Sequence, residues 1–163
     1  MPVPAQSYST PADGDTYFAG RMFTTMWTTA TTDQKQAALN QATSIINLFS
    51  YVGCKTDPAQ PFAFPRKGIV LEGVLLDDSV APNDILSAQF EIALALLKGI
   101  DPEKEIAGIG VTSRGFASVR TTYDSNRTSE HLENGVPSAL AWALLYPFFN
   151  VNDSGSIDLR RVS

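Results

Sequence analysis

Apolar residues recur at helical spacing in four parts of the chain, and each part predicts a helix. The clearest helix is expected over residues 32–52. Thr31 and Gln34 form a capping-box pattern ahead of it, and Gly53 is expected to end it. The apolar stripe of this helix consists of Ala38, Ala42, Ile45 and Phe49, widened by Leu39 and Ile46.

A second long helix is expected to begin at Pro82, a residue type favoured in a first turn, and to end at Gly99. Because its second half is apolar on nearly all sides, we expect this helix at the centre of the core. The last helix is expected to begin at Pro137 and to stop near Pro147.

The N-terminal region predicts an extended arm over residues 1–12, which contain three prolines. A short helix is expected over residues 16–27, capped by Asp13 or Asp15. The residues at helical spacing within it are Tyr17, Phe18, Arg21 and Met22.

The pattern changes after the second long helix. Residues 106–124 alternate and are rich in Gly, Val, Thr and aromatic side chains, which predicts a β-hairpin or a long β arm. Residues 125–135 are polar and loop-like, and residues 150–163 predict a turn followed by a short strand. The expected fold is therefore mainly α: a small bundle of three or four helices with an inserted β-hairpin arm and extended N- and C-terminal segments. We expect one domain, with the helical core at residues 13–99 and the C-terminal helix at 136–149.

The connection between the two long helices contains the sequence QPFAFPRKGI at residues 60–69. Its prolines exclude a helix or a central strand, and its phenylalanines make it too apolar for a solvent-exposed linker. We expect a rigid brace that packs on the helices, in which Pro65 keeps the backbone extended and Arg66 remains available for a specific contact.

The composition, 44% hydrophobic and 18% charged, is typical of a soluble globular domain. No apolar run has transmembrane length, and the N-terminus lacks the basic and apolar regions expected of an export signal. The single cysteine, Cys54, excludes an internal disulfide and fits synthesis in the cytoplasm. The net charge of -5 arises in the first 110 residues, which carry seven basic and twelve acidic side chains, so DNA is not expected to be the main partner.

The residues predict no catalytic site, no metal site and no cofactor, and therefore not an enzyme. His131, the only histidine, lies in a polar segment without a nucleophile or a carboxylate nearby in the sequence. Cys54 has no second cysteine with which to hold a metal, and we expect it to be half-buried. The glycines that end at Gly115 do not form a phosphate-binding loop, because Phe116 follows where that loop requires a lysine.

The C-terminal segment has the ligand spacing of a calcium-binding loop from Asn150 onward. Arg161 stands at its last position, where such a loop needs a bidentate glutamate, so we expect a turn there. Trp27 and Trp142 are expected to anchor the core or a subunit interface.

The proline-rich connection, the β arm and the apolar-basic tail IDLRRVS at residues 157–163 are not explained by a monomeric globular domain. Long ordered excursions are usually functional, and strand-forming arms commonly add to a partner's sheet. The residues therefore predict a protein that takes part in an assembly.

Five motifs and their order carry a resemblance that spans nearly the whole chain. They are YFAGR…W at 17–27, QAALNQATSIINL at 36–48, FPRKG at 64–68, PNDILSAQFEIALALL at 82–97 and VPSALAWALLYPFF at 136–149, followed by a final LRRV. In order and spacing they resemble the head–tail adaptor (connector) proteins of tailed bacteriophages, a group often placed under a DnaT-like single-stranded-DNA-binding heading. Where that group usually has Trp-Gly after the second helix, this chain has YVG at 51–53.

The resemblance implies a small helical protein that forms a ring, typically of twelve copies, beneath the portal protein at the capsid vertex. One end of the ring would bind the portal and the other would meet tail or nozzle proteins, and DNA would pass through the lumen without specific binding. The implied location is the head–tail interface of the virion, with no membrane partner.

The resemblance also implies roles for particular residues. The portal-docking tail would consist of Ile157, Leu159, Arg160, Arg161 and Val162, with the two arginines reaching acidic groups on the portal. Phe64, Pro65 and Arg66 would brace the connection; the alternative is a structural turn with no partner. The β arm would contact a neighbouring subunit through Val111, Phe116, Val119 and Tyr123.

A single-stranded-DNA-binding protein is the alternative function. Such a protein needs aromatic side chains interleaved with basic ones. The β arm supplies this composition with Phe116, Arg120, Tyr123 and Arg127, and the net charge opposes it.

Overall fold

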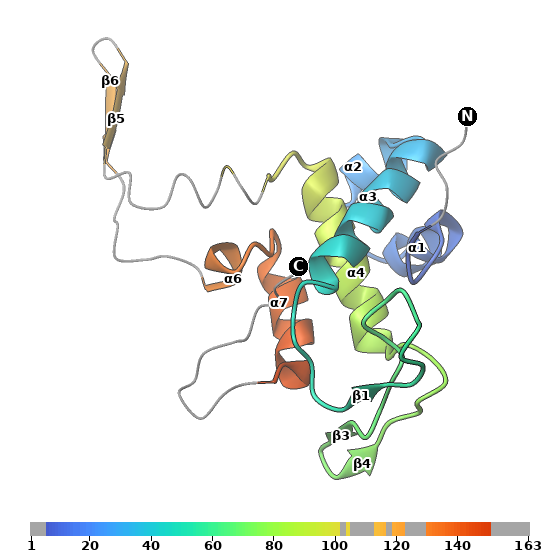
Figure 1. The fold of residues 1–163 in the computed structure, drawn as a ribbon. Helices are drawn as coiled ribbons and strands as arrows, with labels where there is room; N and C mark the ends of the chain where they lie inside the picture. Colours follow the sequence, from blue (N-terminus) through green and yellow to red (C-terminus); the bar gives the residue numbers. More distant parts are fainter. Residues whose placement is uncertain (1–5, 102–103, 105–112, 117–118, 123–129, 151–163) are drawn as a thin grey trace.

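The computed structural model describes residues 6–101, 104, 113–116, 119–122 and 130–150. These residues form a mainly α fold with small β-hairpins, as the sequence predicts (Figure 1). The elements in chain order are α1 (Pro11–Phe18), α2 (Thr25–Thr29), α3 (Thr32–Ile46), β1 (Cys54–Lys55), β2 (Arg66–Lys67), β3 (Val70–Leu71), β4 (Val74–Leu75), α4 (Asn83–Leu97), β5 (Ser113–Phe116), β6 (Val119–Thr122), α6 (Glu130–Glu133), α7 (Ala139–Leu145) and the 3-10 helix η1 (Tyr146–Phe148).

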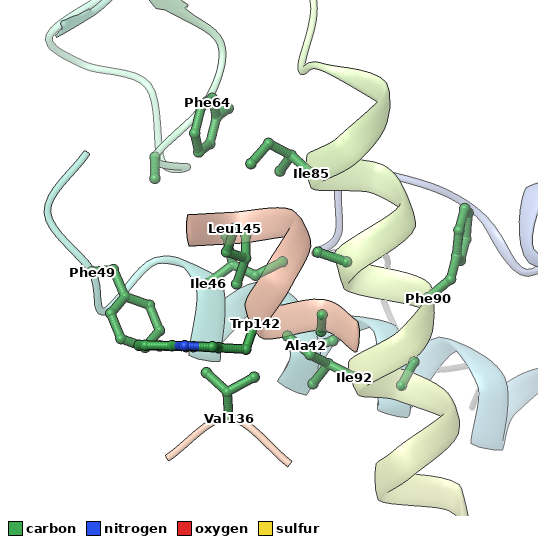
Figure 2. Packing of buried hydrophobic residues seen from close by; sticks show 14 of the residues in the cluster. Ala42, Ile46, Phe49, Phe64, Ile85, Phe90, Ile92, Val136, Trp142 and Leu145 are labelled. Atoms are coloured by element: carbon green, nitrogen blue, oxygen red, sulfur yellow. The ribbon is translucent and has the colours of Figure 1, made fainter. Parts of the chain in front are cut away.

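The core is built around α4, which packs against α3, α7, α1 and α2. Its side chains from Ala88 to Ala95 are all buried, which confirms the predicted central position. Figure 2 shows Ile46 of α3, Ile92 of α4 and Leu145 of α7 within one apolar cluster. Trp27 and Trp142 both belong to this cluster, as expected for core anchors.

Helix α3 begins as predicted and ends earlier than predicted. The backbone N–H of Gln34 donates to Thr31 Oγ1 at 3.2 Å, and the N–H of Thr31 donates to Gln34 Oε1 at 2.8 Å, which completes the capping box. The helix ends at Ile46 and not at Gly53. The Tyr51 hydroxyl donates to the carbonyl oxygen of Ile46 at 2.7 Å, so a buried side chain satisfies a carbonyl that a longer helix would have used.

The predicted helix over residues 16–27 is two helices in the structure. Helix α1 begins at Pro11, inside the segment expected to be an extended arm. Its cap is Thr10, whose backbone N–H donates to Asp13 Oδ2 at 2.9 Å, while Thr10 Oγ1 accepts from the N–H of Asp13 at 3.3 Å. Asp13 is thus the partner of the cap, and neither Asp13 nor Asp15 is the cap itself.

The break between α1 and α2 follows from the position of Trp27. The Trp27 side chain is completely buried, its ring centroid is 5.0 Å from that of Phe18, and its ring also contacts Gly14. A continuous helix would place Trp27 and Gly14 about 20 Å apart along its axis. The chain therefore turns back after α1, so that Trp27 covers the helix that precedes it.

The last helix begins close to its predicted position. The Ser138 hydroxyl oxygen accepts from the N–H of Ala141 at 3.2 Å, and Pro147 lies within η1, where α7 ends. Tyr51 and Phe149 then form an isolated antiparallel bridge, which joins the end of this helical segment to the chain after α3.

A β-hairpin and a short helix are described between α4 and α7. Strands β5 and β6 pair antiparallel from Ser113 opposite Thr122 to Phe116 opposite Val119, which confirms a hairpin within the predicted arm. Figure 1 shows this hairpin well apart from the helices. The rest of 106–124, including Val111 and Tyr123, lies outside the described residues. Helix α6 forms where a loop was expected, because Glu130–Glu133 closes one helical turn.

Candidate interaction surfaces

The FPR segment of the connection lies against the core. The Phe64 side chain is 1% exposed, and its ring centroid is 4.7 Å from that of Tyr51 and 5.8 Å from that of Phe148. Residues 61–63 and Pro65 are bends, so this segment is not extended as expected; the peptide bond between Phe64 and Pro65 is cis. This part of the connection is therefore packed on the residues that follow α3 and α7.

The Arg66 guanidinium is bound by the chain's own backbone. Nη2 donates to the carbonyl oxygens of Tyr51 at 2.9 Å and Gly53 at 2.7 Å, and Nε donates to that of Val52 at 2.8 Å. Nη1 donates to the carbonyl of Ala63 at 3.3 Å. The specific contact that we expected of Arg66 is thus made within the chain, where its guanidinium holds the backbone of residues 51–53 beside β2.

Polar side chains fasten residues 6–10 to the helices, which the sequence pattern did not predict. The Tyr8 hydroxyl donates to Asn47 Oδ1 at 2.8 Å, and the same oxygen accepts the N–H of Ala63 at 2.8 Å. Burial raises the pKa of Tyr8 well above its ordinary value. Tyr8 thereby connects the N-terminal segment, α3 and the connection.

Gln89 is the most deeply buried polar side chain in this region, at 0% exposure. Its amide nitrogen donates to Thr43 Oγ1 at 2.7 Å and to the carbonyl of Leu39 at 3.2 Å, and its amide oxygen accepts from the Ser9 hydroxyl. Among the described residues, every buried side-chain N or O atom has a hydrogen-bond partner. These polar groups thus fix the register of the packed elements and leave no unused buried group as a candidate for chemistry.

The α1–α2 connection carries the most exposed apolar side chains. Met22 is 80% exposed, Phe23 is 82% exposed and Met26 of α2 is 46% exposed. We call these three residues the Phe23 knob. Phe23 has a φ of 63°, a left-handed conformation that is uncommon for a bulky residue.

The Phe23 knob is held from both sides. Before it, Arg21 forms an ion pair with the buried carboxylate of Glu91 on α4, and the Tyr17 hydroxyl donates to the same carboxylate at 2.9 Å. After it, the indole Nε1 of Trp27 donates to Asp15 Oδ1 at 2.8 Å. The exposed side chains of the Phe23 knob are therefore flanked on both sides by residues that bind buried groups.

The outward side of α7 and η1 forms a second apolar surface. We call it the α7 face, and it consists of the exposed residues Ala139, Leu140, Ala143, Tyr146 and Pro147. Leu140 is 46% exposed and Tyr146 is 47% exposed. The opposite side of α7 contributes Ala141, Trp142 and Leu145 to the core.

The β3–β4 hairpin forms a third apolar surface, which is bordered by acidic side chains. Val70, Val74 and Leu75 are 57%, 63% and 65% exposed. Glu72 lies in the turn, and Asp77 and Asp78 follow β4. A hydrogen bond from the Ser79 hydroxyl lowers the pKa of Asp77, which therefore stays ionised at neutral pH.

A metal-binding arrangement is lacking within the described part of the chain. No group of three or more His, Cys, Asp or Glu there could hold a metal ion. His131 is partly buried in α6, and its Nδ1 lies 2.8 Å from the carbonyl oxygen of Val136. Cys54 is exposed, not half-buried as expected, because it lies on the outer side of the short strand β1. Of the helices described, none is long and apolar enough to cross a membrane.

Several predicted site residues fall outside the described residues. They are Val111, Tyr123, Arg127, Ile157, Leu159, Arg160, Arg161 and Val162. Of the remaining residues of the β arm, Phe116 and Val119 face each other as the last pair of the β5–β6 ladder. The portal-docking tail and the side chains of the arm therefore stay predictions.

Comparison with known proteins gives one relationship. Neither the curated proteins nor the solved structures contain a match to this chain. A family model described as "Putative DnaT-like ssDNA binding protein" matches residues 2–162, which is nearly the whole chain. The protein therefore belongs to this DnaT-like family.

Proposed function

We propose that this protein is a structural virion protein: a head–tail adaptor that forms a ring between the portal and the tail of a tailed phage. The observation that carries the proposal is the distribution of exposed apolar side chains on the described residues. The Phe23 knob, the α7 face and the β3–β4 hairpin are separate surfaces on one small domain. The motif order that resembles phage adaptor proteins supplies the identity of the assembly.

A monomer rarely exposes several apolar surfaces, because each one lowers solubility and promotes association. An adaptor subunit needs several, since it contacts two neighbouring copies, the portal on one side and tail proteins on the other. The number and separation of the surfaces therefore fit a subunit of a larger assembly better than a free domain.

The charge of the chain supports passage of DNA without retention. Glu72, Asp77 and Asp78 around the β3–β4 hairpin are among the acidic residues that give the chain its net charge of -5. Carboxylates repel phosphates, so a lumen lined by such residues would not hold the genome. In this proposal the tail residues Ile157 to Val162 dock on the portal, and the β arm contacts a neighbouring subunit.

The test is sedimentation of the protein with the portal protein encoded in the same phage genome. Full-length protein is compared with a variant that lacks residues 150–163. Comigration that depends on these residues supports the adaptor function and the docking tail. Comigration without them supports the function and assigns the contact to another surface, whereas no comigration contradicts the proposal.

Single-stranded-DNA binding is the second candidate function, because the description of the family names it. The measurement is the fluorescence anisotropy of a labelled single-stranded oligonucleotide at low and at moderate salt. Binding that weakens as salt rises would favour this function, since phosphate contacts release counterions. No binding at low salt would exclude it.

A further inference from the structure

We propose that copies of this chain associate head to tail, with the Phe23 knob of one copy packed against the α7 face of the next. The inference deepens the proposed function and rests on it in one respect: an adaptor ring requires a repeating contact of this kind.

Helix α4 lies between the elements that carry the two surfaces. Helix α4 packs against both α2 and α7, and Figure 1 shows α1 and α2 on one side of α4 and α7 on the other. A two-fold symmetric pair that buries the same surface of each copy would leave the other surface exposed. A contact between them is therefore heterologous and passes from copy to copy, which closes a ring if the rotation allows it.

Both surfaces are free of charge in a chain whose residues are 18% charged. No Asp, Glu, Lys or Arg occurs from Met22 to Thr32 or from Val136 to Phe149. The buried centres of protein interfaces are depleted in charged residues and enriched in aromatic residues and methionine, which is the composition of the knob. The β3–β4 hairpin is a poorer match for either surface, because burying it would remove water from its acidic border.

The α7 face carries a small side chain between two larger ones. Ala143 lies one helical turn from Leu140 and one turn from Tyr146, so a larger residue flanks it on each side. Phe23 is a single aromatic side chain that is 82% exposed. Exposed aromatic side chains that become buried among apolar neighbours are typical hot spots of interfaces.

The knob is also held in place before any partner binds. The Arg21–Glu91 ion pair precedes it and the buried Trp27 follows it, and between them Phe23 keeps a left-handed backbone conformation. Strained conformations of this kind persist only where the surrounding contacts fix them, and they cluster at functional sites. A rigid anchor loses little conformational entropy on binding, which favours association.

The test is intermolecular cross-linking between cysteines placed at the borders of the two surfaces. Cys54→Ser removes the native thiol, and Met22→Cys is then combined with Ala139→Cys, so that Phe23, Leu140 and Tyr146 stay in place. A short bismaleimide reagent is applied to the free protein and to the protein mixed with the portal. The expected result is a ladder of dimers, trimers and larger species for the double variant, and monomers for each single variant.

Mixed samples and matched controls identify the contact. A mixture of the two single variants should stop at dimers, because each copy then carries one reactive side. Leu75→Cys combined with Ala139→Cys should give no ladder, although Leu75 is 65% exposed. Adding Phe23→Ser to the cross-linking variant should reduce the ladder at least ten-fold, whereas adding Val74→Ser should leave it unchanged.

The outcomes separate this inference from the proposed function. Absence of a ladder in both conditions overturns the inference. It does so even if the thiol introduced by Ala139→Cys becomes protected from alkylation, because that protection would show that another segment covers α7. Efficient dimers from either single variant also overturn it, because they indicate a symmetric pair. Comigration with the portal without a ladder supports the adaptor function and contradicts the contact between the Phe23 knob and the α7 face. A ladder without portal comigration supports that contact and contradicts the adaptor function.

Discussion

Gly14 lies directly against the indole of Trp27: a Cβ atom at Gly14 would stand 2.3 Å from Cζ2 of that ring. Gly14→Ala should therefore destabilise the protein, although alanine is the better helix former by about 1 kcal/mol. Overpacking a tightly packed site typically costs about 1–3 kcal/mol, and the ring of Trp27 is fully buried and cannot move away. Urea unfolding followed by tryptophan fluorescence measures the change.

Gly20→Ala is the matched control for this prediction, because no atom lies within 4 Å of the position of its Cβ. Its free energy of unfolding should equal or slightly exceed that of the wild type. Equal stabilities for the two variants would show that Trp27 does not pack on α1 as described.

Phe23→Gly should stabilise the folded domain while it weakens self-association. Phe23 is 82% exposed and has a φ of 63°, so glycine loses little buried area. It relieves a strain of about 1–2 kcal/mol, which exceeds the cost of about 0.5–1 kcal/mol for the added freedom of the unfolded chain. The measurements are the midpoint of thermal unfolding and the cross-linked fraction.

Met22→Gly tests whether Phe23→Gly stabilises the domain because it relieves the left-handed backbone conformation. Met22 is exposed to a similar extent, 80%, but it is not among the residues with positive φ. Glycine there only adds freedom to the unfolded chain and should lower the free energy of unfolding by about 0.5–1 kcal/mol. Changes of the same sign in both variants would contradict the strained conformation of Phe23.

Arg21→Met should destabilise the protein by about 1–3 kcal/mol, because it leaves a carboxylate without its charged partner. The Glu91 side chain is 8% exposed and pairs with Arg21, whose side chain is 37% exposed. The double variant Arg21→Met, Glu91→Met should recover part of the loss, since an apolar pair needs no partner. Additive losses in this double-mutant cycle would indicate that the two groups do not interact.

Asp15→Asn should reduce stability at neutral pH and make little difference in acid. The hydrogen bond from Lys35 and, next, that from the Trp27 indole hold the pKa of Asp15 below its ordinary value. A depressed pKa contributes stability that is complete above the unfolded pKa, about 3.9, and is lost as pH falls through the folded pKa. The difference in unfolding free energy between wild type and variant should therefore be constant from neutral pH to about pH 5 and then shrink.

Asp78→Asn, at an exposed aspartate in the loop after β4, serves as the control for the same titration. A difference for Asp15→Asn that persists unchanged in strong acid would show that the contact of Trp27 with Asp15 does not depend on the carboxylate charge.

Arg66→Lys should destabilise the connection even though it keeps the charge. The guanidinium donates to the carbonyls of Tyr51, Val52 and Gly53 at once, which a lysine ammonium cannot reproduce in that geometry. A loss of about 2 kcal/mol is expected from the unsatisfied carbonyls. Lys67→Arg changes the exposed neighbour and should leave the unfolding midpoint within error; an equal effect of both substitutions would contradict the role of Arg66.

The sequence predicted those elements whose formation depends on residues that are neighbours along the chain. The capping box of Thr31 and Gln34 and the apolar run of α4 needed only neighbouring residues, and both were confirmed. The start of α1 had an equally local signal, Thr10-Pro11-Ala12-Asp13, which is a capping box with proline in the first turn. It was missed because the three prolines before Asp13 favoured an extended arm.

Other features depend on residues distant in the sequence and had no local signal. The end of α3 is determined by Tyr51 turning back onto Ile46 and by the bridge from Tyr51 to Phe149. The break after α1 depends on the burial of Trp27. Met22 of the Phe23 knob is expected in a helical stripe for the same reason, since periodicity cannot show that the helix ends before it.

The hydrogen bonds of residues 6–10 bear on the order in which the chain folds. Ser9 bonds to Gln89, 80 residues later, and Tyr8 bonds to Asn47, 39 residues later, so these residues are synthesised well before their partners. Neither bond can form until those partners have been synthesised and α3 has packed on α4. Residues 6–10 are thus made before the groups that hold them, and their docking reports that the connection and both long helices are already in position.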